Sequence, residues 1–556
     1  MIALNPAPPA PSQTASSPTA GFLPDFNQVA NLAFGQSPST AFTSVARISD
    51  VNLAPFATRL TLNLSLKAGQ KYSFNLHYPS GGPAVSLVDA KGKKTAVKMV
   101  NGFSVGKSGN YQLVFSSSQP LKSGASLDSV EINSKALLPT KSGDTRIDAL
   151  LAGGTNQWWH DVNSSPVKGT QQISPKAKAL ASGSSVTELT YNFLSSAPSG
   201  QNMTEFREMT DAQKEAVRRA FDYYSKIINV SFREVTGNGT GNINLGSNQQ
   251  TGSAGYANPP NASGVKDKAF LFLAHNAATN SAPGMQEGGY GYMTVLHEIG
   301  HTLGLKHPGN YNAGGGGTPG PYLPTAEDSH QFSMMSYNAS NSTRGANPSS
   351  AMLYDVAALQ YLYGTKANSS TATDGVFNFS PDEKAVRTLW SNTVTDRIDL
   401  TNLRNGSDVD LNAGAFSNIN KTAGAESTVH SGNKNVALAY GSKVNSVTLS
   451  NANGVTETVT LNNAFKSGSF NSINRFDALD DKIVLKTSLF KKLSAANISF
   501  SETATTKNTK IIVNRTTGEI FYDADGNGKG IAKKIAQYTA VAGRGEVSAA
   551  NFTFKA

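Results

Sequence analysis

The chain has 556 residues, more than one hydrophobic core normally supports, so we expect about two to four domains. Cysteine is absent, which excludes disulfide bridges, and no apolar run is long enough to span a bilayer. The net charge of +10 comes from scattered Lys and Arg without an aromatic-interleaved basic patch, so we expect no nucleic-acid binding.

Residues 1–44 are rich in Pro, Ala, Ser and Thr and cannot bury much apolar surface, which predicts a disordered leader. The first 46 residues contain no Lys or Arg and no long apolar core. We therefore expect no conventional secretory signal peptide. The low charged fraction of 15%, together with 51 Gly, is typical of a β-rich exported protein.

Residues 45–140 alternate apolar and polar positions with a period of two, which predicts a small accessory β-sandwich. The alternating apolar residues are Leu60, Leu62, Leu64, Leu66, Tyr72, Phe74, Leu76, Tyr111, Leu113 and Phe115. Its role stays open between a pro-domain, a substrate- or surface-binding module and a passive folding appendage.

The segment 146–365 mixes helical and strand signals and is predicted to form one catalytic domain. Thr210 and Gln213 make a capping box that opens a helix, and its core-facing residues are Val217, Phe221, Tyr224 and Ile228. Strands are predicted at 188–193, 242–245 and 270–273. A helix at 355–363 closes the domain.

Within this segment, residues 294–308 place three histidines and a glutamate at spacings that suit a metal site. If Thr294 caps a helix, His297 and His301 lie one turn apart on the same face, with Glu298 beside them. Gly304 can adopt the left-handed backbone that ends the helix and returns His307 as a third ligand.

The alternative is a set of ordinary structural histidines, but three of only 8 His fall in this pattern. We expect no ligand role for His160, His275 or His330, which lack such spacing.

About thirty residues downstream, residues 332–337 combine a tight turn, Met335 and Tyr337. With the histidine motif, this segment resembles the methionine turn of the metzincin proteases, and the Met-Ser-Tyr form resembles the serralysin family of secreted zinc metalloendopeptidases. Further resemblance lies at 146–151, 309–314, 326–328, 331–333 and 354–364.

The site and the resemblance together imply Zn²⁺ held by His297, His301 and His307, with Glu298 as the general base of peptide-bond hydrolysis. The resemblance also implies that Tyr337 is a further ligand at rest and stabilises the oxyanion during the reaction. Met335 would form an apolar floor below the metal. Protein or peptide substrates, a secreted, extracellular location and a monomer are the corresponding expectations.

Residues 366–556 are β-rich, but the Gly-Gly-x-Gly-x-Asp repeats that bind calcium in the family are missing. We therefore expect a degenerate β-roll. One loop keeps oxygen ligands at alternate positions, namely Asp523, Asp525 and Asn527, which makes it a candidate Ca²⁺ site. The alternative for this loop is a plain hairpin turn.

The last part of the chain resembles the ends of type I secreted proteins, at 474–485, 517–528 and 547–554. An uncleaved export signal within roughly the last sixty residues, read by type I secretion machinery, is the resulting expectation.

The predicted fold class is α+β, with a metzincin catalytic domain between an N-terminal β-sandwich and a C-terminal degenerate β-roll. The favoured function is a secreted zinc-dependent endopeptidase. Two alternatives are a catalytically inactive surface or binding protein derived from such a protease, and a structural protein of the extracellular matrix. All three motif histidines, Glu298 and Tyr337 are present, which favours the enzyme.

Overall fold

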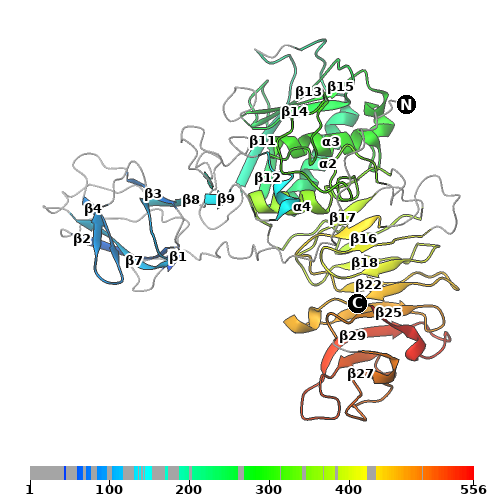
Figure 1. Ribbon diagram of the computed structural model, residues 1–556. Coiled ribbons are helices and arrows are strands. Elements are labelled where there is room, and N and C mark those ends of the chain that lie inside the picture. The colour runs from blue at the N-terminus through cyan, green and yellow to red at the C-terminus, as the bar shows by residue number, and fades with distance from the viewer. Residues whose placement is uncertain are drawn as a thin grey trace.

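The computed structural model shows a mixed α/β protein in which sheets dominate and helices are few (Figure 1). The structure describes residues 43–44, 59–66, 71–76, 84–96, 103–116, 130–135, 137–139, 142, 144–152, 170–172, 187–199, 203–260, 268–313, 315–340, 346–366, 368–381, 386–421, 434–490 and 493–555. Most of the predicted leader, 1–42, lies outside them. No helix in the described ranges is both long and apolar enough to cross a membrane.

The N-terminal strands form a sheet in the order β1-β2-β7-β4-β5 and a second sheet in the order β6-β3-β8. The alternating pattern predicted β2, β3 and β7, and these strands are confirmed. The bounds are β1 Thr43–Ser44, β2 Arg59–Leu66, β3 Lys71–Leu76, β4 Ala84–Asp89, β5 Lys94–Ala96, β6 Phe103–Ser104, β7 Gly109–Ser116 and β8 Val130–Lys135. A separate antiparallel pair joins β9 (Leu137–Pro139) to β10 (Thr170–Gln172).

The middle of the chain is built on a sheet in the order β12-β11-β13-β15-β14. Neighbouring strands run parallel except β14, which pairs antiparallel with β15 at the edge. The bounds are β11 Thr187–Phe193, β12 Val230–Glu234, β13 Ile243–Asn248, β14 Gly255–Asn258 and β15 Ala269–Ala274. The predicted strands match β11, β13 and β15, whereas β12 and β14 were not predicted.

Helices pack on this sheet and share one core with it. Thr210 and Gln213 form the predicted capping box of α2 (Asp211–Ile227), whose apolar side chains are buried. The other helices are α1 Thr145–Asp148, α3 Tyr290–Thr302 and α4 Leu353–Tyr363, with short 3₁₀ turns η2 Ala278–Asn280 and η3 Ala282–Met285. The α3 helix, which carries His297 and His301, contacts β14 and β15 and so lies beside the edge strand.

Below the helices, short parallel strands stack one under another (Figure 1). In one sheet Phe377, Ile398, Val447 and Ile473 are aligned in register. In the other, the aligned residues are Val409, Val459, Ile483 and Phe552. Both rows are buried in a single cluster, and burying each such side chain contributes about 1.5–3 kcal/mol. The stacked rows therefore hold this part together.

The C-terminal strands are β16 Val376–Asn378, β17 Arg387–Leu389, β18 Arg397–Asp399, β19 Asp408–Asp410, β20 Phe416–Ser417, β21 Val436–Leu438, β22 Ser446–Thr448, β23 Thr458–Thr460, β24 Asn471–Phe476, β25 Lys482–Lys486, β26 Ile498–Ser499, β27 Ile511–Asn514, β28 Glu519–Tyr522, β29 Lys533–Ala540 and β30 Phe552–Lys555. The 3₁₀ turns here are η4 Ala464–Ser467, η5 Ala495–Asn497 and η6 Ala549–Asn551.

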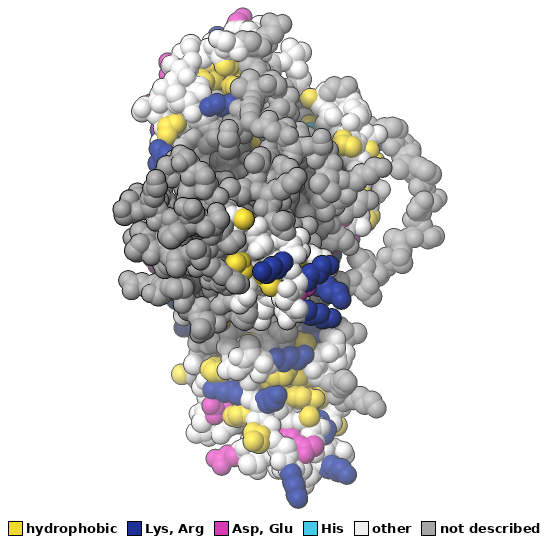
Figure 2. All heavy atoms as spheres, turned by 90° about the vertical axis from the view of Figure 1, so that its left-hand side faces the viewer, with side chains coloured by type: hydrophobic (Ala, Val, Ile, Leu, Met, Phe, Trp, Pro, Cys, Tyr) yellow, Lys and Arg dark blue, Asp and Glu magenta, His cyan; other side chains and the backbone are white. Residues whose placement is uncertain are grey.

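Carboxylates on the stacked strands are paired with lysines of the same chain. Lys421 Nζ lies 2.8 Å from Asp408 Oδ1, and Lys486 Nζ lies 2.9 Å from Asp410 Oδ2. On the face shown in Figure 2, Lys and Arg of this lower part lie among Asp and Glu. Lysine ammonium groups of the same chain thus neutralise the negative charge of these two carboxylates.

Candidate metal centre

The α3 helix carries the first two motif histidines, but it begins one turn earlier than the sequence predicted. Gly289 is its N-cap residue, so the prediction of Thr294 as the cap is wrong. The Thr294 hydroxyl instead donates to the Tyr290 carbonyl within the helix, at 3.0 Å. The predicted end is confirmed, since α3 stops at Thr302 and Gly304 has φ +96°.

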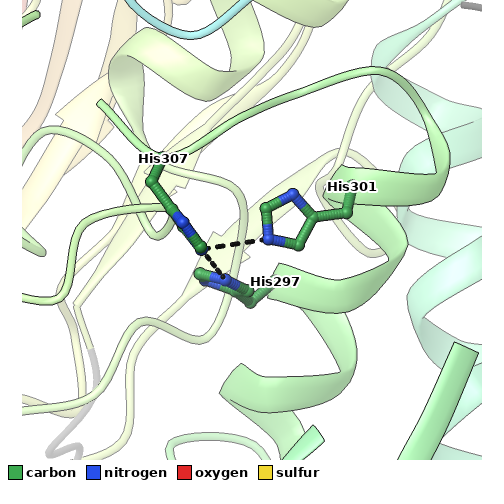
Figure 3. A group of neighbouring side chains, drawn as sticks. All are labelled: His297, His301 and His307. Atoms are coloured by element: carbon green, nitrogen blue, oxygen red, sulfur yellow. Dashed lines mark hydrogen bonds between the residues drawn. The ribbon is translucent and has the colours of Figure 1, made fainter. Parts of the chain in front are cut away.

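The turn at Gly304 brings His307 back to His297 and His301 (Figure 3). The Nε2 atom of His307 lies 3.2 Å from that of His297 and 3.1 Å from that of His301. Each Nδ1 atom faces a backbone carbonyl. The three carbonyls belong to Met334 for His297 (2.8 Å), Leu305 for His301 (2.9 Å) and Tyr311 for His307 (3.0 Å).

These carbonyls decide which ring nitrogen carries the hydrogen. A carbonyl oxygen only accepts, so each Nδ1 is the N–H donor and each Nε2 of the neutral ring presents a lone pair. Lone pairs that face one another at these distances repel, so the dashed contacts in Figure 3 do not act as ordinary hydrogen bonds. A cation that accepts all three lone pairs removes the repulsion, and the donor set fits zinc.

Burial keeps the three rings in the neutral form that binds metal. It lowers the pKa of His301 to about 3 and lowers the pKa values of His297 and His307 as well. Repulsion from neighbouring histidines adds to the effect at His297 and His301. Among the residues that the structure describes, these histidines form the one group of three or more metal-ligating side chains whose ligand atoms converge.

Glu298 is buried against the edge strand of the sheet. A Cβ atom at Gly255 of β14 would lie 3.1 Å from Glu298 Cγ, so the glycine lets strand and helix approach closely. Burial raises the pKa of Glu298 to about 8, opposed by a hydrogen bond from the Ala257 backbone. Its Oε2 atom is buried without a hydrogen-bond partner. An unpartnered carboxylate oxygen here is costly unless it serves a ligand.

The predicted methionine turn lies directly under α3. Gly300 lies between His297 and His301 in the sequence. A Cβ atom at Gly300 would come within 2.8 Å of Met335 Sδ and 3.1 Å of Met334 Cε, so the glycine lets the two methionines pack closely against the helix. Both methionines are fully buried. The turn thereby supports the helix by packing and orients His297 through the Met334 carbonyl.

Asp355 at the start of α4 fixes this turn and was predicted only as the first residue of a helix. Its carboxylate accepts from Ser333 Oγ at 2.6 Å and from the backbone N–H groups of Met334 and Met352 at 2.7 and 2.8 Å. Burial nevertheless raises the pKa of Asp355 to about 7. An acidic residue at the start of a predicted helix was the available signal.

Tyr337 lies over the histidines from the side of the methionine turn. Its ring centroid is 4.5 Å from that of His307 and 4.9 Å from the stacked ring of Tyr311. Burial raises the pKa of Tyr337, and the nearby Glu298 charge adds to the rise. The structure therefore brings Tyr337, Glu298 and the three histidines together.

The two described histidines outside this group, His275 and His330, lie within hydrogen-bond distance of backbone carbonyls. His330 is buried, and its Nε2 donates to the Ser336 carbonyl at 2.9 Å. His275 lies 3.1 Å from the Glu205 carbonyl, and His160 lies outside the described residues.

In the candidate calcium loop, the Asp523 carboxylate accepts backbone N–H groups of Asp525 and Gly526, and Asp525 accepts that of Gly530. Asn527 uses its backbone N–H to reach Thr506, at 3.2 Å. The Lys510 ammonium also donates to the Ala524 carbonyl of this loop, at 2.7 Å. Calcium binding by Asp523, Asp525 and Asn527 stays a prediction.

No protein-family model matches the chain. Among curated proteins, it is 32% identical over 298 residues to Metallopeptidase AprA of Pseudomonas marginalis, an alignment that covers 49% of this chain and 59% of that protein. It is 36% identical over 252 residues to Serralysin of Proteus mirabilis, covering 39% and 50% respectively. It is 33% identical over 294 residues to Serralysin C of Dickeya chrysanthemi, an alignment that covers 48% of this chain and 56% of that protein.

Among solved structures, that of myroilysin matches 32% of this chain and 94% of its own at 19% identity, with a TM-score of 0.22. The chain spans about 50% to 59% of the length of the three curated relatives above. Over about half its own length, the chain is similar to metalloproteases named serralysin and AprA.

Proposed function

We propose that the chain is a zinc-dependent endopeptidase that hydrolyses peptide bonds in proteins. One observation carries the proposal: three imidazoles with engaged Nδ1 atoms turn their Nε2 atoms toward one another, next to a buried carboxylate with an unpartnered oxygen. The names of the similar proteins support the same activity. The alternative of an inactive binding protein is not favoured, because a structural site gains nothing from an unpartnered Glu298 oxygen.

In this proposal His297, His301 and His307 hold zinc, which when bound supplies Lewis acidity that polarises the carbonyl of the scissile peptide bond. Glu298 takes the proton of the attacking water at Oε2 and delivers it to the leaving amine nitrogen. The Tyr337 hydroxyl donates a hydrogen bond to the oxygen that becomes negative in the transition state. Burial of His297, His307 and Glu298, with partial burial of His301 and Tyr337, strengthens their electrostatic effects.

The proposed architecture around the site is a metzincin catalytic domain flanked by an N-terminal β-sandwich and a C-terminal degenerate β-roll. The fully buried Met335 below α3 supports this assignment, as do the stacked parallel strands after residue 376. We also propose a secreted monomer that type I machinery exports.

Casein hydrolysis tests activity and location together. We expect the purified protein and the cell-free medium of producing cells to clear casein, a zinc chelator to stop it and added zinc to restore it. Casein hydrolysis that persists after complete zinc removal contradicts the proposal.

Tyr337→Phe tests the role of the tyrosine hydroxyl. Because the hydroxyl is proposed to act in the transition state, we expect kcat to fall about 10²–10³-fold, as for loss of one oxyanion donor, with KM and zinc content nearly unchanged. Steady-state kinetics and metal analysis measure the three quantities. A change confined to KM contradicts the oxyanion role.

Calcium removal is expected to have a small effect on stability. Lys421 and Lys486 already pair with Asp408 and Asp410 in the stack, and the loop with Asp523 is the candidate ion site that the sequence offers. We expect a calcium-selective chelator, with zinc kept saturating, to shift Tm by no more than about 4 °C, the effect of about 1 kcal/mol in a domain of this size. A shift several times larger contradicts this account of the C-terminal part.

A further inference from the structure

Tyr311 lies in the loop after His307 and touches two of the proposed site residues at once. Its carbonyl oxygen accepts the Nδ1–H of His307 at 3.0 Å. Its ring stacks on the ring of Tyr337, with centroids 4.9 Å apart and an interplanar angle of 25°. The Tyr311 hydroxyl also lies 3.3 Å from Oγ of Ser336, the residue before Tyr337. One residue therefore contacts both a proposed metal ligand and the proposed oxyanion donor.

Asp328 anchors the phenol of Tyr311. The Tyr311 hydroxyl donates to Asp328 Oδ1 at 2.6 Å, and Ser336 Oγ donates to the same oxygen at 2.7 Å. Asn338 Nδ2 donates to the Asp328 carbonyl at 2.9 Å. Ser336 and Asn338 are the two neighbours of Tyr337 in the chain, so Asp328 holds the side chains on both sides of it.

Packing against Gly309 also restrains the Tyr311 ring. A Cβ atom at Gly309 would lie 2.1 Å from Tyr311 Cε1 and 2.8 Å from Asp328 Oδ2. Only glycine leaves room for this ring position. The Tyr311 ring therefore packs against the chain at Gly309 as well as against the ring of Tyr337.

His330 restrains the same segment a second time. Its backbone N–H donates to the Asn338 carbonyl and its Nε2 to the Ser336 carbonyl, both at 2.9 Å. With the backbone of Tyr337 tied down, the side chain is the part of this residue left to move. Stacking on Tyr311 then decides where that side chain rests.

From these contacts we propose that Tyr311, anchored by Asp328, is a positioning residue that sets the resting place of the Tyr337 side chain. The inference rests on the proposed function insofar as Tyr337 takes part in catalysis. A tyrosine side chain misplaced by about 1 Å at a reaction centre can cost on the order of 10²-fold in rate. The Tyr311 ring thus affects turnover through the position of Tyr337.

The direct test places 3-fluorotyrosine at position 337 of the zinc-loaded, full-length protein and records its ¹⁹F resonance. Tyr311→Leu removes the stacked ring and is expected to shift and broaden the resonance, whereas Tyr311→Phe keeps the ring and restores most of the wild-type position. Tyr322→Leu is the matched control, because Tyr322 belongs to the same loop and its hydroxyl donates to the Thr318 carbonyl, at 2.6 Å, and not to Asp328.

Kinetics on a fluorogenic peptide supply the second readout. We expect Tyr311→Leu to lower kcat about 10-fold to 10²-fold with KM and zinc content retained, and to cause little further loss in a Tyr337→Phe background. Asp328→Asn removes the anchoring charge at constant size and is expected to act in the same direction more weakly. It serves as the test if Tyr311→Leu does not fold.

An unchanged ¹⁹F resonance in Tyr311→Leu, or equal losses of kcat in both backgrounds, overturns the positioning role. If Tyr337→Phe retains full turnover, the proposed catalytic role of Tyr337 fails instead. The ¹⁹F result still decides whether Tyr311 positions that side chain, so the two failures are distinguishable.

Discussion

Glu298→Ala is expected to abolish nearly all proteolysis while leaving zinc content and fold intact. Glu298 is not among the converging ligand atoms, and its Oε2 has no partner to lose. A positioned general base contributes about 10²–10⁴-fold, so kcat/KM should fall by that factor. Fluorogenic-peptide kinetics, zinc analysis and circular dichroism measure the three properties on one preparation.

The matched control for this variant is Glu287→Ala. Glu287 is an exposed glutamate just before the same helix, so its removal tests the loss of one negative charge near α3. We expect wild-type kinetics from the control. If zinc-loaded Glu298→Ala protein hydrolyses peptide at the wild-type rate, the general-base mechanism is wrong.

The sequence predicted those parts of the site that depend on residue spacing. His297 and His301 share a helix face at any start point of the helix, so the wrong cap at Thr294 did not change the predicted geometry. The left-handed turn at Gly304 follows from residue type, and it places His307. These relations are local, and local relations can be derived from one sequence.

The atoms that orient the histidines could not be predicted in this way. They are the backbone carbonyls of Met334, Leu305 and Tyr311, which have no signature in the sequence, together with the Asn312 side-chain oxygen, 2.8 Å from His307 Nδ1. The same holds for the Tyr311 ring, whose partner Tyr337 is 26 positions away in the numbering. Their positions depend on how loops pack, which only the folded chain defines.

Many of the strands that the sequence did not predict are short. The edge strand β14 has only 4 residues and lies among Gly, Asn and Pro, which resemble a turn. Several strands of the C-terminal stack have 3 residues and a single buried position each, so no period of two can be detected. Their register arises from in-line contacts such as Ile398 with Val447.

His301→Ala is expected to lose the metal. Two imidazoles bind zinc far more weakly than three, and since loss of a supporting hydrogen bond alone costs about 10–100-fold in affinity, loss of a ligand should exceed about 100-fold. Zinc analysis after dialysis measures the effect directly. Thermal melting gives an independent readout, because a ligand that binds only the folded state raises Tm. A zinc chelator should therefore lower Tm of the wild type and leave that of the variant unchanged.

Two further variants separate metal loss from damage to the fold. His301 Nδ1 also donates to the Leu305 carbonyl, so alanine removes a structural hydrogen bond as well as a ligand. His301→Gln retains donor groups without an imidazole lone pair and should lose zinc just as completely. His275→Ala removes a histidine bonded to the Glu205 carbonyl outside the site and should keep the metal. Retention of zinc at wild-type affinity by both His301 variants would mean that the three histidines are not the metal site, and the converging Nε2 atoms would then need another explanation.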